Sequence, residues 1–281
     1  MINSFLEMFS YSFMTRAFIV GVLISLSASL IGVSLVLRKN SMIGDGLSHV
    51  GFGAFAVATI FGFAPLEFAI PVVVIVSFLI LKLNENNKIH GDSAIALLSS
   101  SSLAIGTFLI SITPGVNTDV SNYLFGSILA INKADVIVSI ILTIFIICLY
   151  IISYNKIFAI TFDEKFAKSI GINTNFYNII FSILCSLTVV LGMRLLGSLL
   201  ISSLIIFPSL ISMNICKNFK GVVILSAIIS IICFIVGMTI SFSASTPTGA
   251  TVVLVNLALL IITILINKIL LFKNKSKLSR S

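Results

Sequence analysis

Long apolar runs, each about as long as a bilayer is thick, constrain this chain more than any other feature. A helix needs roughly 20 apolar residues to cross the hydrocarbon core, where its backbone must satisfy its own hydrogen bonds. The apolar residues of each run are continuous and do not alternate with polar ones, which favours helices over the strands of a membrane barrel. We therefore predict an all-α fold, a polytopic transmembrane helical bundle of eight or nine helices. The nine runs cover residues 17–37, 43–62, 65–83, 93–112, 134–153, 177–193, 195–214, 221–240 and 247–267.

The composition excludes the soluble alternatives. Of the 281 residues, 58% are apolar and only 9% are charged, whereas a soluble domain has about 25% charged residues. Such a chain cannot cover a water-facing surface, so neither a soluble globular enzyme nor a disordered chain fits. We expect residues 1–281 to form a single transmembrane domain, with an interfacial segment at 1–16 and a basic tail at 268–281.

The distribution of Lys and Arg predicts the orientation of the chain. Of the 17 basic residues, all but Arg16, Lys133 and Arg194 fall on one side of the nine-helix arrangement. Cytoplasmic loops are enriched in Lys and Arg, so the C-terminal tail is expected in the cytoplasm and the N-terminus outside. The net charge of +8 then reflects membrane topology and does not indicate a nucleic-acid partner.

One pair of ionisable residues in an apolar run is the main candidate for chemistry. A charge near the bilayer centre costs from about 2.5 kcal/mol upward, so such residues are functional candidates. Asp45 and His49 are four residues apart at the start of the run 43–62, which places both on one helix face. A carboxylate oxygen and an imidazole nitrogen suit zinc, manganese or iron. The alternative is structural, with Asp45 favoured at a helix N-terminus and His49 bonded to a nearby carbonyl.

A polar stretch at residues 161–172 predicts a short helix between two of the runs. Asp163 is placed to cap this helix and Gly171 to end it. Phe166 and Ile170 would then share one face. The helix is either a solvated connector or a knob that fits a groove of a partner.

Small residues repeat every four positions on the first run, at Gly21, Ser25 and Ser29. Such a face lets helices approach closely. It predicts either packing within the chain or a contact between two copies of it.

Four stretches together carry a resemblance to a known family. They are GDGLSH (44–49), FDEKFAKSIGI (162–172), MRLLGSLLISSLIIFP (193–208) and STPTGATVVL (245–254). In this order they resemble the signature stretches of the membrane permease of ATP-driven metal-uptake transporters. This is the zinc/manganese/iron family that an extracytoplasmic binding protein supplies. The likeness extends from about residue 15 to residue 267.

The resemblance implies a multi-pass protein of the cell membrane that works with partners. These would be a second permease subunit in a homodimer, a cytoplasmic ATP-binding subunit and an extracytoplasmic metal-binding protein. Asp45 and His49 would be the ligands of the transported metal, and no cofactor would be bound permanently. The segment 162–172 would be the coupling helix that seats on the ATP-binding subunit. Its contact residues would be Asp163, Glu164, Phe166, Ala167, Ile170 and Gly171.

The chain departs from the family pattern before the fourth run. Many relatives carry an acidic pair there, whereas this chain reads His90, Gly91, Asp92, so only Asp92 matches.

Two other classes compete with this interpretation. A secondary transporter could couple to protons or sodium through Asp45, His49 and Glu67. An intramembrane aspartyl protease would need a second intramembrane Asp beside Asp45, and Met42 stands where its motif has a glycine. The sequence has no phosphate-binding loop of the G-x-x-x-x-G-K-[ST] type, so we do not expect the chain to hydrolyse ATP itself.

Overall fold

Each of the nine apolar runs is helical in the computed structural model, which describes residues 11–85, 91–113, 126, 131 and 133–278. The described helices are α2 (Ser12–Leu37), α3 (Ile43–Phe61), α4 (Pro65–Glu85), α5 (Gly91–Ile112), α7 (Lys133–Phe162), α8 (Glu164–Ser169), α9 (Thr174–Leu196), α10 (Ser198–Ile215), α11 (Phe219–Ala244) and α12 (Thr248–Leu278). Eight of them are long and apolar enough to cross a membrane, and α4 contributes the shorter apolar stretch Pro65–Ile80. The predicted all-α, multi-pass fold is confirmed.

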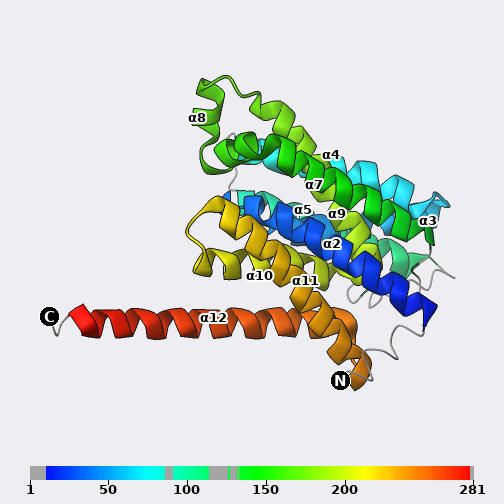
Figure 1. Cartoon of the computed structure of the whole chain (residues 1–281). Helices are drawn as coiled ribbons and strands as arrows, with labels where there is room; N and C mark the ends of the chain where they lie inside the picture. Colours follow the sequence, from blue (N-terminus) through cyan, green and yellow to red (C-terminus); the bar gives the residue numbers. More distant parts are fainter. Residues whose placement is uncertain (1–10, 86–90, 114–125, 127–130, 132, 279–281) are drawn as a thin grey trace.

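The long helices lie beside one another, and α8 and the C-terminal end of α12 lie at the same end of the bundle (Figure 1). α2 packs against α7, α10 and α11, while α3 packs against α4, α5, α9 and α10. The chain therefore forms two groups of helices that meet where α10 and α9 contact both α2 and α3.

Two chain reversals follow from local sequence. Gly62 ends α3 in the left-handed region, with φ of 71°, and Pro65 is the first residue of α4. A glycine just past a helix and a proline at its first position are the preferred residues for those places. The predicted break between the second and third runs is confirmed.

One predicted helix boundary was wrong. The break between the sixth and seventh runs lies at Gly197, with φ of 95°, and Arg194 lies inside α9. Residues 12–16 form the first part of α2, residues 1–10 of the predicted interfacial segment lie outside the described part of the chain, and the segment stays a prediction. The tail is helical as far as Leu278, because α12 continues through it.

Buried hydroxyl groups join the helices to one another. The hydroxyls of Ser27 and Thr143 are hydrogen-bonded at 3.0 Å between α2 and α7. Ser186 of α9 donates to the carbonyl of Val73 in α4 at 3.2 Å. Apolar side chains gain little by leaving lipid, so such bonds and close packing hold membrane helices together.

The small-residue face of α2 packs inside the chain. Gly21, Ser25 and Ser29 are all buried. A side chain at Gly21 would collide with the ring of Phe234 in α11, and Ser230 donates to the carbonyl of Ser25 at 2.9 Å. The face contacts α11 within the chain, which agrees with the first of the two predicted alternatives, and the contact between two copies stays a prediction.

Glycines bring α3 and α5 into direct backbone contact. A Cβ atom on Gly46 would lie 2.5 Å from Ile95, and one on Gly53 would lie 2.6 Å from the carbonyl oxygen of Ser102. The contact moves from Ile95 to Ser102 along α5 as it moves from Gly46 to Gly53 along α3. The residue numbers increase together, so α3 and α5 lie side by side and run in the same direction.

Gly53→Ala should lower the stability of the protein by about 1–3 kcal/mol, because the added carbon meets rigid backbone. Thermal unfolding of the detergent-purified protein measures this, with a thiol-reactive dye that reports exposure of the buried Cys185 and Cys233. Ala104→Val adds bulk at an exposed position of α5 and serves as the control. Equal melting temperatures for the two variants would contradict the close approach.

Candidate functional site

Asp45 and His49 lie together on the first two turns of α3. The Nε2 atom of His49 is 3.7 Å from the Oδ2 atom of Asp45. The side chain of His49 is 22% exposed and that of Asp45 is 40% exposed, so the pair is reachable from outside the bundle core. The helical spacing has brought the carboxylate and the imidazole to one face, as the sequence predicted.

Two glycines allow neighbouring helices to close around this pair. A Cβ atom on Gly44 would lie 2.7 Å from Ile205 of α10, and Gly46 faces Ile95 of α5. The turn of α3 that carries Asp45 is therefore wedged between α10 and α5.

Ser202 is a polar neighbour of the pair that the sequence reasoning did not single out. Its hydroxyl lies 3.4 Å from Oδ1 of Asp45, and it also donates to the carbonyl of Ser198 at 2.9 Å. Ser202 is inside the stretch 193–208 that carried part of the family resemblance. That stretch was the only signal for it, because a single serine in an apolar helix predicts no contact.

The pair offers two side chains of the kinds that bind metal ions. Among the described residues, no group of three or more His, Cys, Asp or Glu side chains could hold a metal ion. Asp92 lies in the first turn of α5 and is exposed, while His90 lies outside the described residues. The site is thus more open than a structural metal site, which needs four ligands.

Glu67 is far from the pair. It lies in the first turn of α4, just beyond the end of α3, whereas Asp45 lies in the first turn of α3. The 19 residues of α3 span about 28 Å at 1.5 Å per residue. Glu67 therefore cannot act together with Asp45 and His49 on one ion.

A second acidic residue is engaged in an ion pair away from this site. Asp135, in the first turn of α7, is buried, and its Oδ1 atom lies 3.5 Å from a guanidinium nitrogen of Arg194 in α9. The Arg194 partner compensates the charge of this buried carboxylate, and Asp135 offers no second catalytic acid beside Asp45.

The predicted short helix is present as α8. The Oδ1 atom of Asp163 accepts a hydrogen bond from the backbone N–H of Phe166 at 2.9 Å, and Gly171 follows the helix with φ of 84°. Ala167 is fully buried, whereas Phe166 and Ile170 are 56% and 54% exposed. The small residue anchors the helix, and the two large apolar side chains point away from the bundle.

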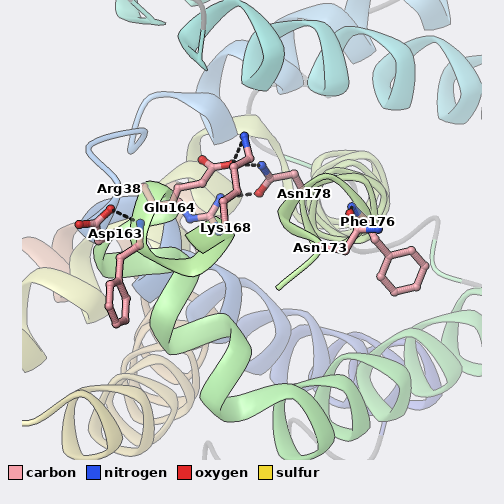
Figure 2. A network of polar contacts seen from close by, with 8 residues as sticks. Arg38, Asp163, Glu164, Lys168, Asn173, Phe176 and Asn178 are labelled. Atoms are coloured by element: carbon pink, nitrogen blue, oxygen red, sulfur yellow. Dashed lines mark hydrogen bonds and ion pairs between the residues drawn. The ribbon is translucent and has the colours of Figure 1, made fainter. Parts of the chain in front are cut away.

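A hydrogen-bond network joins α8 to the ends of two long helices (Figure 2). Asn178 of α9 donates to Oε1 of Glu164 at 2.9 Å and accepts from Arg38 at 3.0 Å. Lys168 lies 3.9 Å from the same Glu164 oxygen. Asn178 and Arg38 are further residues that the sequence reasoning missed, because the network joins positions 140 residues apart.

A groove of about 710 Å³ opens between α2, α7 and α11 and is lined almost wholly by apolar side chains, with Lys220 and Asn155 among the exceptions. Neither Asp45 nor His49 lines it. The groove is therefore separate from the candidate ion site.

The fold defines a multi-pass α-helical membrane protein. The comparisons with known proteins identify its family: the chain belongs to the ABC 3 transport family, whose model matches residues 10–267. The family predicted from the four sequence stretches is confirmed, which removes the intramembrane protease from consideration.

Individual relatives are similar over almost their whole length. The manganese import system permease protein ScaB of Streptococcus gordonii is 29% identical over 267 residues, which are 95% of this chain and 96% of that protein. The manganese transport system membrane protein MntC of Halalkalibacterium halodurans is 26% identical and covers 89% of this chain and 85% of its own length. The solved structure of PsaBC from Streptococcus pneumoniae in complex with Fab matches with a TM-score of 0.82 at 28% identity, covering 94% of this chain and 95% of that one.

Asp163→Ala should loosen α8, because losing a helix N-cap costs about 0.5–2 kcal/mol. Hydrogen exchange of the α8 amides in the purified protein measures the change, which we expect to be about fivefold or more. Ser169→Ala, at the other end of the same helix, removes a hydroxyl without removing the cap and is the control. Unchanged exchange in Asp163→Ala would contradict the assigned cap.

Proposed function

We propose that this chain is the permease subunit of an importer that carries divalent transition-metal ions across the cell membrane, driven by a separate ATP-binding subunit. The observation that carries the proposal is the accessible Asp45–His49 pair on α3, in a chain of the ABC 3 transport family. Zinc, manganese and iron all suit an oxygen and a nitrogen ligand. The manganese relatives favour manganese as the first ion to test.

The pair binds the metal as cargo. The Asp45 carboxylate would neutralise part of its charge, and a neutral His49 imidazole would give a directional nitrogen ligand. Two side chains replace only part of the hydration shell, and water, backbone oxygens or a second subunit would supply the rest. A transport site must hold an ion weakly enough to release it, and an incomplete ligand set meets that requirement.

A second copy of the chain would fit along α5 and α12. Only 11% of the apolar stretch of α5 and 17% of that of α12 is buried. These two helices pack on α3 and α10, which hold Asp45, His49 and Ser202. A homodimer closed along α5 and α12 would bring the two Asp–His pairs toward a shared pathway.

The ATP-binding subunit would seat on α8. Phe166 and Ile170 present exposed apolar groups on a short helix at one end of the bundle, and helix knobs of this kind fit hydrophobic grooves. The Lys and Arg count assigns that end to the cytoplasm, where ATP is available. The metal would arrive at the opposite side from an extracytoplasmic binding protein.

Asp45→Ala and His49→Ala should each lower metal uptake by at least about tenfold, because each removes one of two side-chain ligands. Uptake of radiolabelled Mn²⁺ and Zn²⁺ by the reconstituted complex measures the effect, with membrane insertion checked in parallel. Glu67→Ala, at the other end of α3, should leave uptake unchanged. Normal uptake in both ligand variants would show that the pair is structural, and loss of uptake only in Glu67→Ala would favour secondary transport.

Phe166→Asp should weaken binding of the ATP-binding subunit by about tenfold or more, since it places a charge in an apolar contact. Co-purification of the two subunits and ATP-driven uptake measure the loss. Phe176→Asp introduces the same charge at a residue of similar exposure on α9 and is the matched control. Equal recovery of the ATP-binding subunit with Phe166→Asp and the unaltered chain would count against α8 as its seat.

A further inference from the structure

A buried amide joins two charged side chains from two other elements. Asn178 is 5% exposed. Its Oδ1 atom accepts from Nη1 of Arg38 at 3.0 Å, and its Nδ2 atom donates to Oε1 of Glu164 at 2.9 Å (Figure 2). An amide carries both an acceptor and donors, so it can link a cation to an anion. Hydrogen bonds to charged groups are about twice as strong as neutral ones.

One end of this connection is α8. Glu164 is the first residue of that helix. Ala167 is fully buried, and the N–H of Ile172 donates back to its carbonyl at 3.0 Å. The six-residue helix is held at its start by the hydrogen bond of Glu164 and near its end by that of Ile172. A movement of α8 therefore also moves Glu164.

The other end is the corner between α2 and α3. Arg38 is the residue that ends α2, and its guanidinium lies 5.3 Å from the ring centre of Phe181. Backbone hydrogen bonds hold the corner from Asn40 to Leu35 at 2.9 Å and from Ile43 to Asn40 at 3.1 Å. The α3 helix starts at once after this turn, so Arg38 and Asp45 are joined by a short hydrogen-bonded segment.

The same corner packs on the helix that holds Ser202. A side chain at either Gly32 or Gly44 would collide with Ile205 of α10. A shift of the corner would thus move α3 relative to α10 at the point where Asp45 and Ser202 meet.

Contacts other than those of Asn178 also hold α2 and α9 in place. Other contacts fix α2 against α7, including hydrogen bonds of Ser27 with Thr143 and of Ser34 with Tyr150. The Ser186 bond to Val73 fixes α9 against α4. Removing the amide leaves Arg38 and Glu164 each short of one hydrogen bond, so the assembly of each variant complex is checked beside its transport.

We propose that Asn178 is a positioning residue that couples the α8 docking helix to the metal-binding end of α3 through Arg38. The inference rests on the proposed function, since it links the seat of the ATP-binding subunit to the Asp45–His49 pair. A movement of α8 on ATP binding is passed through Glu164 and Asn178 to Arg38, and so to the turn that begins α3. Glu164, Asn178 and Arg38 contact one another in turn, and the chain leads from Arg38 through the hydrogen-bonded corner into α3.

The test is the ratio of metal moved to ATP hydrolysed. Complexes of the permease with its ATP-binding subunit are reconstituted in liposomes, and ATP-driven Mn²⁺ uptake and ATP hydrolysis are measured in the same vesicles. Asn178→Leu keeps the volume and removes both hydrogen bonds. Asn178→Asp keeps the shape and the acceptor for Arg38 but sets a carboxylate against Glu164. Asn175→Leu, exposed on the first turn of α9, is the control.

Asn178→Leu and Asn178→Asp should each lower the Mn²⁺-to-ATP ratio at least about fivefold, the lower end of typical coupling between sites. Asn175→Leu should stay within about twofold of the unaltered chain. The double variant Arg38→Gln, Asn178→Leu should have the same Mn²⁺-to-ATP ratio as Asn178→Leu alone, because both residues act in one path.

An unchanged ratio in Asn178→Leu, or uptake and hydrolysis falling in proportion, would overturn the coupling role. Failure of both Asn178 variants to assemble, while Asn175→Leu assembles, would overturn it too, because the amide would then be needed for folding. An unaltered complex that imports none of Mn²⁺, Zn²⁺ and Fe²⁺ contradicts the proposed function. An unaltered complex that imports Mn²⁺, beside an Asn178→Leu complex of normal ratio, contradicts only the link.

Discussion

Polar groups inside a bilayer must find partners within the protein, because lipid offers none. This constraint accounts for much of what α2 does. Its serines bond to neighbouring helices or to its own backbone, and its glycines let α10 and α11 approach. Once these groups are satisfied inside the chain, the partly exposed carboxylate and imidazole of α3 differ from their surroundings. They are the ionisable groups of α3, and the fold leaves them accessible on a helix that is otherwise mostly buried.

The need to pair polar groups inside the protein also places the candidate ion site and the α8 helix in different parts of the chain. Glycines on α3 set the distance to α5 and α10 around the Asp45–His49 pair. Charged side chains gather instead at the helix ends, where Arg38, Glu164 and Lys168 meet around Asn178. An ion site and a docking helix can therefore lie on different elements and still be joined by one short polar path.

Much of this arrangement follows from local sequence. Nine apolar runs predicted nine helices, the 3.6-residue period placed Asp45 beside His49, and Asp163 with Gly171 predicted α8. Distant contacts could not be predicted in this way. Nothing near Asn178 in the sequence indicates that it meets Arg38, and Ser202 meets Asp45 where Gly44 lets α10 approach α3 closely. The helix break predicted at Arg194 was wrong, since a charged residue between two apolar runs usually indicates a loop. Here Arg194 stays inside α9 and forms an ion pair with the buried Asp135.

The length of α12 has a consequence for how far the chain reaches beyond the lipid. Its 31 residues extend about 46 Å at 1.5 Å per residue, while the hydrocarbon layer is about 30 Å thick. Several turns must therefore stand clear of the acyl chains, on the same side as α8 (Figure 1). Because these turns are helical, they form a stiff rod. A fluorescent label attached near Leu278 would sit at a fixed height above the headgroups and serve as a ruler for whatever docks beside it.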